Sequence, residues 1–246
     1  MRIIGVIPSR WGSTRFPGKS LHPICGKPLV QWVVESVQRA RLLDEVIVAT
    51  DDERIASAVS GFVKVVMTRS DHPSGTDRVA EAAQPQDDDI VINIQGDEPL
   101  MNPDLIDGLV ARMKEDSGWA MATAACPIRC MRDLEARTVV KVVLAQDGGA
   151  LYFSRLPIPC RRDGEPDLSS GLYLRHLGIY AYRGDFLKRL VREAPCALEK
   201  TESLEQLRAL YLGGRIAVIQ TEELGVGVDT PEDVAVVEAI IRKQTI

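Results

Sequence analysis

The sequence predicts an α/β fold with a mostly parallel central sheet in its first half and a smaller mixed α/β part in its second half. In the first half, short runs rich in Val and Ile alternate with longer helix-like runs, which is the βαβ pattern. These short runs are apolar throughout, as is typical of parallel strands covered on both faces. After Ala120 several strand-like segments follow one another between polar stretches, so that half is predicted to be mixed.

Four strands and four helices are predicted in the first half. The strands are 2–7, 45–50, 63–67 and 90–94, and the helices are 28–41, 52–59, 76–83 and 103–114. In the second half we predict strands 121–125, 139–144, 151–154 and 174–182. A long helix is predicted over 197–212, closed by Gly213 and Gly214, and a last helix over 231–242, with Thr230 as N-cap. Residues 161–171 are rich in charge, Gly and Pro and predict an exposed loop.

Composition limits the classes of protein to which this chain can belong. It has 246 residues, of which 45% are hydrophobic, enough for one large core and a small appended subdomain. A net charge of −5, with no basic stripe outside the first loop, argues against a nucleic-acid partner. No segment has the length of a membrane span, so we expect a cytoplasmic protein without membrane insertion. The five scattered cysteines predict free thiols and no zinc site.

The phosphate loop, residues 8–20, follows the first predicted strand and reads Pro-Ser-Arg-Trp-Gly-Ser-Thr-Arg-Phe-Pro-Gly-Lys-Ser. Its glycines let backbone N–H groups approach an anion, and Arg10, Arg15 and Lys19 can neutralise phosphate oxygens. It is not a Walker A loop, because five residues rather than four separate Gly12 from Gly18. A solvated basic loop is the alternative, but the pattern favours binding of a nucleoside triphosphate.

Two carboxylates follow strand-like or glycine-rich segments. Asp97 lies just after the predicted strand 90–94, and Asp229 lies between Gly227 and the last predicted helix. Ligands of open α/β sheets bind at the carboxyl ends of strands, which makes Asp97 a neighbour of the phosphate loop. Since Mg²⁺ takes one or two protein carboxylates together with phosphate oxygens, the pair predicts a magnesium site. Taken singly, each is equally explained as a turn or helix-start residue.

Other polar segments are less specific. The loop-to-helix segment 74–78 contains hydroxyls and an Arg that can bind a base edge, but Thr76 or Asp77 as a helix N-cap explains it as well. Alternation along 174–183 predicts a half-buried strand whose polar face carries His176, Tyr180 and Tyr182. These can line a sugar pocket, although a single strand His is more often structural. Glu202, Glu205 and Gln206 border one face of the predicted helix, either as acceptors for hydroxyls or as an ordinary solvated face.

Nearly end to end, the sequence resembles the 3-deoxy-manno-octulosonate (Kdo) cytidylyltransferases, also called CMP-Kdo synthetases. Sugar nucleotidyltransferases share the first loop and Gln95-Gly96-Asp97 more loosely, whereas three other segments point to the Kdo members: Tyr152-Phe153-Ser154-Arg155, His176-Leu177-Gly178-Ile179-Tyr180 and Leu204-Glu205-Gln206-Leu207-Arg208. Further matches are 7–10, 13–15, 17–19, 49–51, 67–69, 74–78, 140–143 and 227–233. Departures such as Trp11-Gly12, where Tyr-Ala is frequent, concern the geometry of the phosphate loop.

The resemblance implies a Rossmann-like nucleotidyltransferase fold as one domain, with a nucleotide-binding half (1–118), a half for sugar binding and dimerisation (119–228) and a C-terminal helix (229–246). It implies transfer of CMP from CTP to Kdo with Mg²⁺, release of pyrophosphate, a place in lipopolysaccharide biosynthesis and a homodimer. The implied triphosphate residues are Arg10, Ser13, Arg15 and Lys19, and the cytosine residues are Ser74 and Arg78. Asp97 and Asp229 are implied as metal ligands and, with Arg10 and Lys19, as catalytic residues. The implied sugar residues are Gln95, Arg155, His176, Tyr180, Glu205 and Gln206, with Arg155 as the partner of the carboxylate.

Three other functions fit the same residues. The substrate can be a neighbouring acid sugar such as 8-amino-Kdo or a sialic acid, because one substituent decides between them. A nucleotide-sugar-binding protein without turnover is disfavoured by the combination of Lys19, Asp97 and Asp229. A glycosyltransferase typically carries an Asp-x-Asp metal motif, and Gln95-Gly96-Asp97 offers only one of those carboxylates.

Overall fold

The structure is a computed structural model that describes residues 1–12, 16–222 and 225–244. It divides into two compact units. Unit 1 comprises Met1–Asp107 and Gly225–Ile246, and unit 2 comprises Gly108–Leu224. The α/β class predicted from the sequence is confirmed, with a parallel sheet in unit 1 and a mixed sheet in unit 2.

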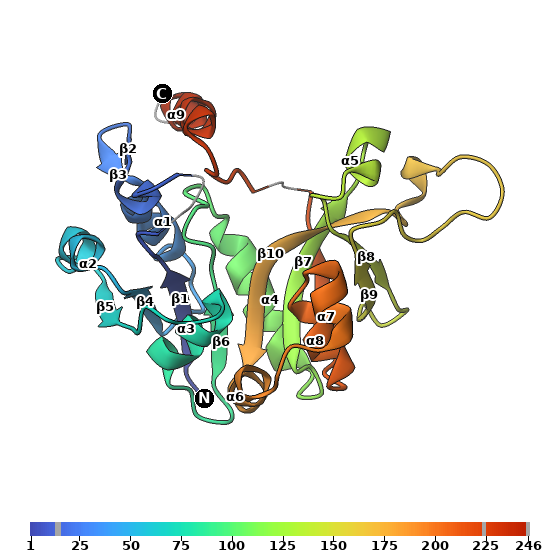
Figure 1. Ribbon diagram of the computed structural model, residues 1–246, viewed down its shortest axis with the longest axis horizontal. Coiled ribbons are helices and arrows are strands. Elements are labelled where there is room, and N and C mark those ends of the chain that lie inside the picture. The colour runs from blue at the N-terminus through green and yellow to red at the C-terminus, as the bar shows by residue number, and fades with distance from the viewer. Residues whose placement is uncertain (13–15, 223–224, 245–246) are drawn as a thin grey trace. The chain divides into compact units, whose positions relative to one another are not determined.

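Unit 1 is built on parallel strands in the order β6 (Ile90–Asn93), β1 (Ile3–Pro8), β4 (Glu45–Thr50) and β5 (Lys64–Met67) (Figure 1). Ile4 pairs with Glu45 on one side and with Val91 on the other, which fixes the register of β1. The strands are apolar runs because both faces are covered, and Ile4 is fully buried. All four therefore end at the same edge of the sheet, as predicted.

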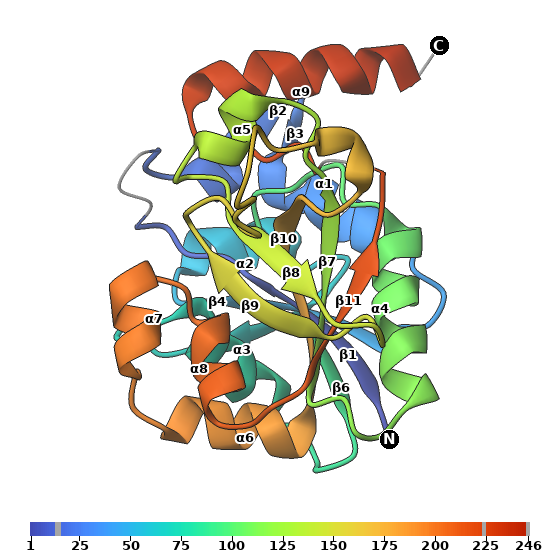
Figure 2. The ribbon, with the colours of Figure 1, turned by 90° about the vertical axis from the view of Figure 1, so that its right-hand side faces the viewer.

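The helices of unit 1 begin close to the predicted residues. They are α1 (Leu29–Val37), α2 (Glu53–Val59), α3 (Gly75–Ala83) and α9 (Pro231–Gln244). Helix α4 (Pro103–Glu115) also begins in unit 1, which ends at Asp107. A short η1 (Lys19–Leu21) leads into the hairpin of β2 (Pro23–Ile24) and β3 (Lys27–Pro28). Helix α9 lies across this hairpin, where Val237 and Ile241 pack with Ile24 and Leu29 (Figure 2). Helix α9 thus shares one hydrophobic core cluster with the β2–β3 hairpin and the start of α1.

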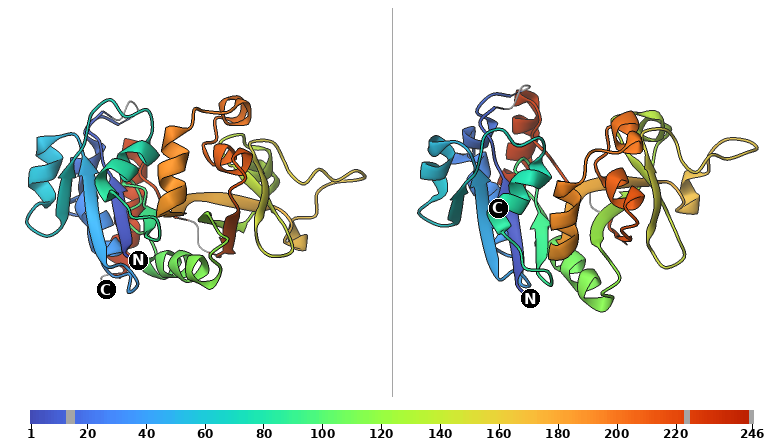
Figure 3. Two further views of the ribbon diagram at one scale, coloured as in Figure 1. Left: turned by 90° about the horizontal axis from the view of Figure 1, so that it is seen from below. Right: turned by 60° about the horizontal axis from the view of Figure 1, so that its bottom comes forward.

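Unit 2 is a mixed sheet. Strand β7 (Met121–Pro127) pairs in parallel with β11 (Ile216–Gln220) and antiparallel with β10 (Leu174–Arg183). Strand β8 (Lys141–Leu144) pairs antiparallel with β10 and with β9 (Ala150–Ser154). Its shorter helices are α5 (Met131–Glu135), α6 (Gly184–Arg192), α7 (Ala197–Glu202) and α8 (Gln206–Tyr211). The loop between β9 and β10, with η2 (Leu168–Ser170), extends away from the strands as a long exposed segment, as predicted (Figure 3).

The prediction of one helix over 197–212 is wrong. Helix α7 ends at Glu202, and Ser203 adopts a left-handed conformation with φ of 52° before α8 begins at Gln206. The break has a cause outside the local sequence. The guanidinium of Arg155 donates to the backbone carbonyls of Glu202 and Ser203, at 2.6 and 3.1 Å, so these carbonyls are taken by a side chain instead of by the next helical turn.

The polar face of the predicted half-buried strand β10 is more deeply buried than expected. The exposed fraction is 9% for His176 and 1% for Tyr182. A bulge between Leu177 and Tyr180 interrupts the pairing with β7 and breaks the strict alternation on which the prediction rested. Helix α3 begins one residue earlier than predicted, and its N-cap is Ser74 rather than Thr76 or Asp77. None of the helices in the described part of the chain is long and apolar enough to cross a bilayer.

Candidate active site

In unit 1 an ion-pair cluster forms where the phosphate loop meets two segments that are distant in the sequence. The Nζ of Lys19 donates to Oδ2 of Asp97 at 2.8 Å and lies 3.6 Å from Oδ1 of Asp229. The side chain of Lys19 is 13% exposed, whereas those of Asp97 and Asp229 are 31% and 50% exposed. The lysine is thus largely enclosed, and the two carboxylates keep surface on which a ligand can bind.

Tight backbone packing brings the two carboxylates together. At Gly96 an added Cβ would lie 2.6 Å from the carbonyl oxygen of Pro8, so the loop after β6 approaches the end of β1 as only glycine allows. The amide of Val228 donates to the carbonyl of Asp97 at 2.8 Å, which ties the segment before α9 to the same loop. Asp233 then receives hydrogen bonds from the amides of Asp229 and Thr230, which holds the start of α9.

This cluster fits a magnesium ion bound together with phosphate. Among the residues that the structure describes there is no group of three or more His, Cys, Asp or Glu side chains that could hold a metal by themselves. Asp97 and Asp229 supply two carboxylates around one cation, Lys19. Two carboxylates are the usual protein share for Mg²⁺, whose remaining ligands are phosphate oxygens and water.

The other cations of the phosphate loop are partly described. Arg10 is exposed, and its side chain makes no hydrogen bond or ion pair with the described residues. Ser13 and Arg15 lie outside the described residues. Arg10 and Lys19 stand on either side of residues 11–18, and the amide of Gly18 donates to the carbonyl of Trp11 at 3.2 Å, which closes the loop.

Ser74 and Arg78, predicted to contact the base, lie at the start of α3. The hydroxyl of Ser74 donates to Asp77 at 2.7 Å and accepts from the Asp77 amide, so this residue also caps the helix. The side chain of Arg78 is 5% exposed and donates to Asp51 at 2.9 Å and to Thr68. The buried pair with Asp51 fixes the direction of the guanidinium. The structure brings both residues to one corner of unit 1.

Unit 2 contains a cavity of about 350 Å³ between β10 and the α7–α8 junction. Four of the predicted sugar residues line it, which are His176, Tyr180, Glu205 and Gln206, although the bulge in β10 and the break at Ser203 were not expected. Arg175, Gly178 and residues 138–140 and 203–204 also line it. Its size suits a small ligand.

His176 is neutral in this cavity. Burial lowers the pKa of His176 from 6.5 to about 3. The hydroxyl of Thr123 donates to the carbonyl of Ile179 at 2.7 Å, so its oxygen accepts from Nε2 of His176 at 3.0 Å. This assignment places the imidazole proton on Nε2 and leaves Nδ1 as an acceptor. Thr123 is therefore a supporting residue that the sequence analysis missed.

Gln206 supplies a donor without a partner. Its side-chain oxygen accepts from the hydroxyl of Tyr180 at 3.3 Å, while its buried Nε2 has no hydrogen bond among the described residues. Burial raises the pKa of Tyr180 well above its ordinary value, so its hydroxyl keeps the proton that it donates. A buried amide donor without a partner is costly, and a ligand hydroxyl or carbonyl in the cavity would remove that cost.

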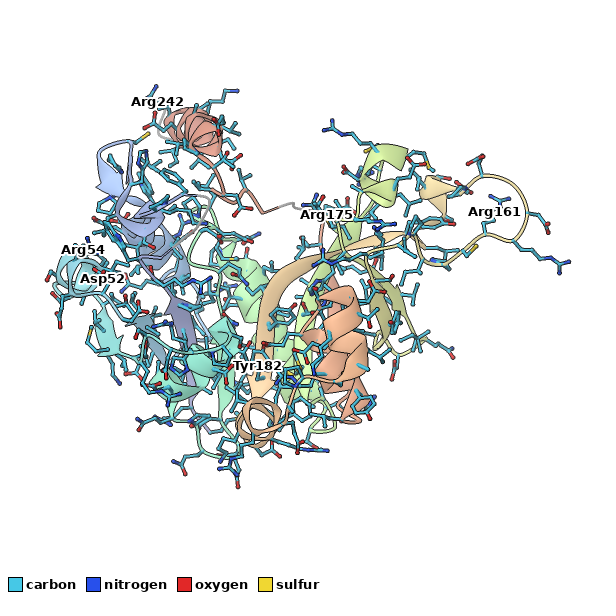
Figure 4. All side chains as sticks on the ribbon, in the orientation of Figure 1. Asp52, Arg54, Arg161, Arg175, Tyr182 and Arg242 are labelled. Atoms are coloured by element: carbon cyan, nitrogen blue, oxygen red, sulfur yellow. The ribbon has the colours of Figure 1, made fainter. Side chains whose placement is uncertain are left out.

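Arg155 does not line the cavity. Its three guanidinium nitrogens donate to the carbonyls of Arg137, Glu202 and Ser203, which links β9 to the α7–α8 junction. Arg175 is among the residues that line the cavity, and its side chain makes no hydrogen bond or ion pair with the described residues (Figure 4). The sequence analysis missed Arg175, although it directly precedes His176. Gln95, also predicted for the sugar, belongs to unit 1.

Known proteins resemble this chain in both sequence and fold. A model of a family described as cytidylyltransferase matches residues 4–216. This chain belongs to the cytidylyltransferase family. It is 52% identical over 241 residues to a 3-deoxy-manno-octulosonate cytidylyltransferase of Pelobacter propionicus, covering 95% of this chain and 94% of that protein. It is 50% identical over 246 residues to the enzyme of the same name from Bdellovibrio bacteriovorus, covering 99% of each.

Solved structures place this cytidylyltransferase in the same group. A CMP:2-keto-3-deoxy-manno-octonic acid synthetase solved in complex with CTP superposes with a TM-score of 0.92 at 41% identity, over 99% of this chain and 100% of the other. A cytidylyltransferase from Leptospira borgpetersenii, at 18% identity and a TM-score of 0.65, shares the fold over 99% of this chain and 87% of its own. The family resemblance seen in the sequence is confirmed.

Proposed function

We propose that this chain transfers CMP from CTP to the anomeric hydroxyl of Kdo and releases pyrophosphate. The observation that carries the proposal is Lys19 held between Asp97 and Asp229 at the end of the phosphate loop. Relatives about half identical over almost the whole chain are named for this activity. In the reaction the hydroxyl oxygen forms a bond to the α-phosphorus. The bond between the α-phosphorus and the oxygen that bridges to the β-phosphorus breaks in line with it, so pyrophosphate leaves, and the hydroxyl proton is released.

Unit 1 supplies the charge for this step. We assign Arg10 and Lys19 to the triphosphate, with Ser13 and Arg15 in support, because positive groups aimed at phosphate oxygens stabilise charge that develops on the leaving pyrophosphate. Asp97 and Asp229 are the proposed Mg²⁺ ligands. When bound, the ion neutralises phosphate charge and orients the triphosphate. Without it Lys19 occupies the space between the two carboxylates, so we expect Lys19 to exchange carboxylate contacts for phosphate contacts when nucleotide and metal bind.

Ser74 and Arg78 are the proposed cytosine contacts. The guanidinium of Arg78 has five N–H donors, of which the pairs with Asp51 and Thr68 use two. The remaining donors suit the oxygen and ring nitrogen acceptors of cytosine. Because Asp51 and Thr68 already fix the guanidinium, little conformational entropy is lost when a base binds.

Unit 2 supplies hydrogen-bonding groups for the sugar. His176, Tyr180 and Gln206 offer a ring acceptor, a hydroxyl and a free amide donor, and Glu205 offers a carboxylate to sugar hydroxyls. Gln95 is assigned to the sugar as well. Two arginines are candidates for the Kdo carboxylate: Arg155, which the family resemblance indicates, and Arg175, which is among the residues that line the cavity.

A homodimer formed through unit 2 is part of the proposal. Large apolar side chains are strongly exposed there, namely Leu151, Leu156, Leu172 and Tyr211, with exposed fractions between 55% and 67%. We expect these side chains to become buried at the interface between the two chains. Light scattering on the purified protein would report the mass of one or two chains, and Leu151→Asp should shift a dimer toward monomer. A cytoplasmic location stays a prediction.

Pyrophosphate release tests the proposed function. The purified protein is incubated with CTP and Mg²⁺ and with Kdo, 8-amino-Kdo or N-acetylneuraminate, with omission of each component as control. Release with Kdo supports the proposal. Release with only another acid sugar would keep the chemistry and change the substrate, and no release with any of the three would favour a nucleotide-sugar-binding protein without turnover.

A further inference from the structure

The indole of Trp11 in the phosphate loop contacts two groups from different segments. The Cζ atom of Arg54, at the start of α2, lies 3.4 Å from the centroid of the indole ring. The same ring lies against Gly18, where an added Cβ would meet Cη2 at 2.9 Å and Cζ2 at 3.1 Å. A residue with a side chain at position 18 would therefore displace the indole, and the left-handed φ of 70° at Gly18 also favours glycine.

Arg54 is itself held in place. Its Nε and Nη2 donate to the two carboxylate oxygens of Asp52 at 2.9 and 2.6 Å (Figure 4). Asp52 is the N-cap of α2 and also accepts from the amide of Arg54. A bidentate pair fixes the plane of a guanidinium, and a fixed plane can stack on an aromatic ring. Asp52, Arg54 and Trp11 thus form a chain of contacts from α2 to the phosphate loop.

The stacked indole lies where the phosphate loop closes. The amide of Gly18 donates to the carbonyl of Trp11, so residues 11 and 18 form the two sides of the closure. Arg10 directly precedes Trp11, and Lys19 directly follows Gly18. The contacts of the indole therefore involve the immediate neighbours of the two cations that we assign to the triphosphate.

We propose that Arg54 and Trp11 are positioning residues that hold residues 11 and 18 together, next to the two cations, Arg10 and Lys19, that we assign to the triphosphate. The inference rests on the proposed function of the loop. Neither residue touches the reacting atoms. Because residues 11 and 18 are held together before CTP arrives, less conformational entropy is lost on binding, so the stack strengthens CTP binding and leaves the sugar site unaffected.

Substitution of Arg54 tests the inference. The side chain is 57% exposed, so Arg54→Ala should fold, with a melting temperature close to wild type. We expect the Kd of CTP, measured by calorimetry without sugar, and the KM of CTP to rise about threefold to tenfold. The KM of the acid sugar and kcat should stay within about twofold of wild type. Arg54→Lys keeps the charge but loses the planar guanidinium. Its Kd of CTP should lie between those of wild type and Arg54→Ala.

Two further variants sharpen the test. Asp52→Asn keeps a good N-cap but loses the ion pair with Arg54, and should raise the Kd of CTP by about twofold. Arg242→Ala removes an exposed arginine of α9 that pairs with Glu238 (Figure 4). It is the matched control and should change neither the Kd nor the KM of CTP. Amide exchange of Gly18 should quicken in Arg54→Ala and stay unchanged in Arg242→Ala.

The outcomes separate the inference from the proposed function. An unchanged Kd of CTP in Arg54→Ala would overturn the positioning role while wild-type turnover still supports the function. An equal rise in both KM values, with a lower melting temperature, would also overturn it, since a purely structural role predicts that pattern. If the wild-type protein bound no CTP, the proposed function itself would fail.

Discussion

The two units build their candidate sites by opposite means. In unit 1 full charges meet, with one lysine between two carboxylates that keep exposed surface. In unit 2 three of the lining side chains are uncharged, a neutral imidazole, a protonated tyrosine hydroxyl and an amide, and they lie beside the charged residues Arg175 and Glu205. Charged groups suit phosphates, whose charge increases on the leaving group, whereas neutral donors and acceptors suit sugar hydroxyls, which are read by hydrogen-bond direction.

This difference also determines how each site tolerates change. A charge removed from unit 1 alters the electrostatics of the reacting phosphates, so its effect should fall on turnover. A group removed from unit 2 leaves a buried partner without a hydrogen bond, so its effect should fall on sugar binding and on stability. The four predictions below test this distinction.

The largest effect is expected for Asp97→Asn. The substitution removes one of the two carboxylates around Lys19 and should lower kcat for pyrophosphate release about a hundredfold to a thousandfold. Folding should persist, because the side chain is partly exposed and similar in shape. The matched control is Asp104→Asn, an exposed aspartate of unit 1 whose side chain pairs with Arg41 and which should retain activity. Full activity in Asp97→Asn would remove the metal assignment and with it the charge-based account of unit 1.

The second effect is a pH dependence that belongs to unit 2. The pKa of His176 falls from 6.5 to about 3 on folding, so between these values the unfolded chain binds the proton and the folded chain does not. Stability is therefore fully present above pH 6.5 and is lost as pH falls, by about 1.4 kcal/mol per pH unit from this residue. Urea unfolding measured from pH 7 to pH 4 should show that the free energy of unfolding decreases less steeply with falling pH in His176→Gln than in wild type. Equal slopes would show that His176 is protonated in the folded protein.

The third effect concerns the backbone that positions Asp97. Gly96→Ala places a Cβ 2.6 Å from the carbonyl oxygen of Pro8, which cannot move without distorting β1. We expect a loss of about 1–3 kcal/mol in the free energy of unfolding, with reduced turnover because Asp97 shifts. Gly61→Ala is the control, since nothing lies within 4 Å of a Cβ there. Equal stability of the two variants would mean that the loop after β6 can relax away from β1.

Local patterns predicted much of unit 1. The apolar run Glu45–Thr50 is a strand with the predicted bounds, and Asp52 begins the following helix as its N-cap, because strand burial and helix capping depend on neighbouring residues. The break at Ser203 was missed because Arg155, far away in the sequence, binds the carbonyls that would continue α7. Helix α6 and strand β11 of unit 2 were missed as well.

The candidate sites could likewise be predicted only where they depend on local sequence patterns. Lys19, Asp97 and Asp229 were named from glycine-rich turns and strand ends, and the structure brings these residues together. Burial of His176 and its bond to Thr123 could not be foreseen, because both depend on how β7 pairs with β10 around a bulge. The stack of Arg54 on Trp11 likewise joins two segments that no sequence pattern connects.

The smallest effect separates the two arginines proposed for the sugar carboxylate. Arg175→Ala removes the charge of a lining residue whose side chain has no partner among the described residues, so the KM of the acid sugar should rise about fivefold to tenfold with stability unchanged. Arg155→Ala instead leaves three backbone carbonyls without their donor and should lower the melting temperature. If Arg155→Lys, which keeps a charge, raised the sugar KM more than Arg175→Ala did, the carboxylate would belong to Arg155, and the cavity would read only the uncharged end of the sugar.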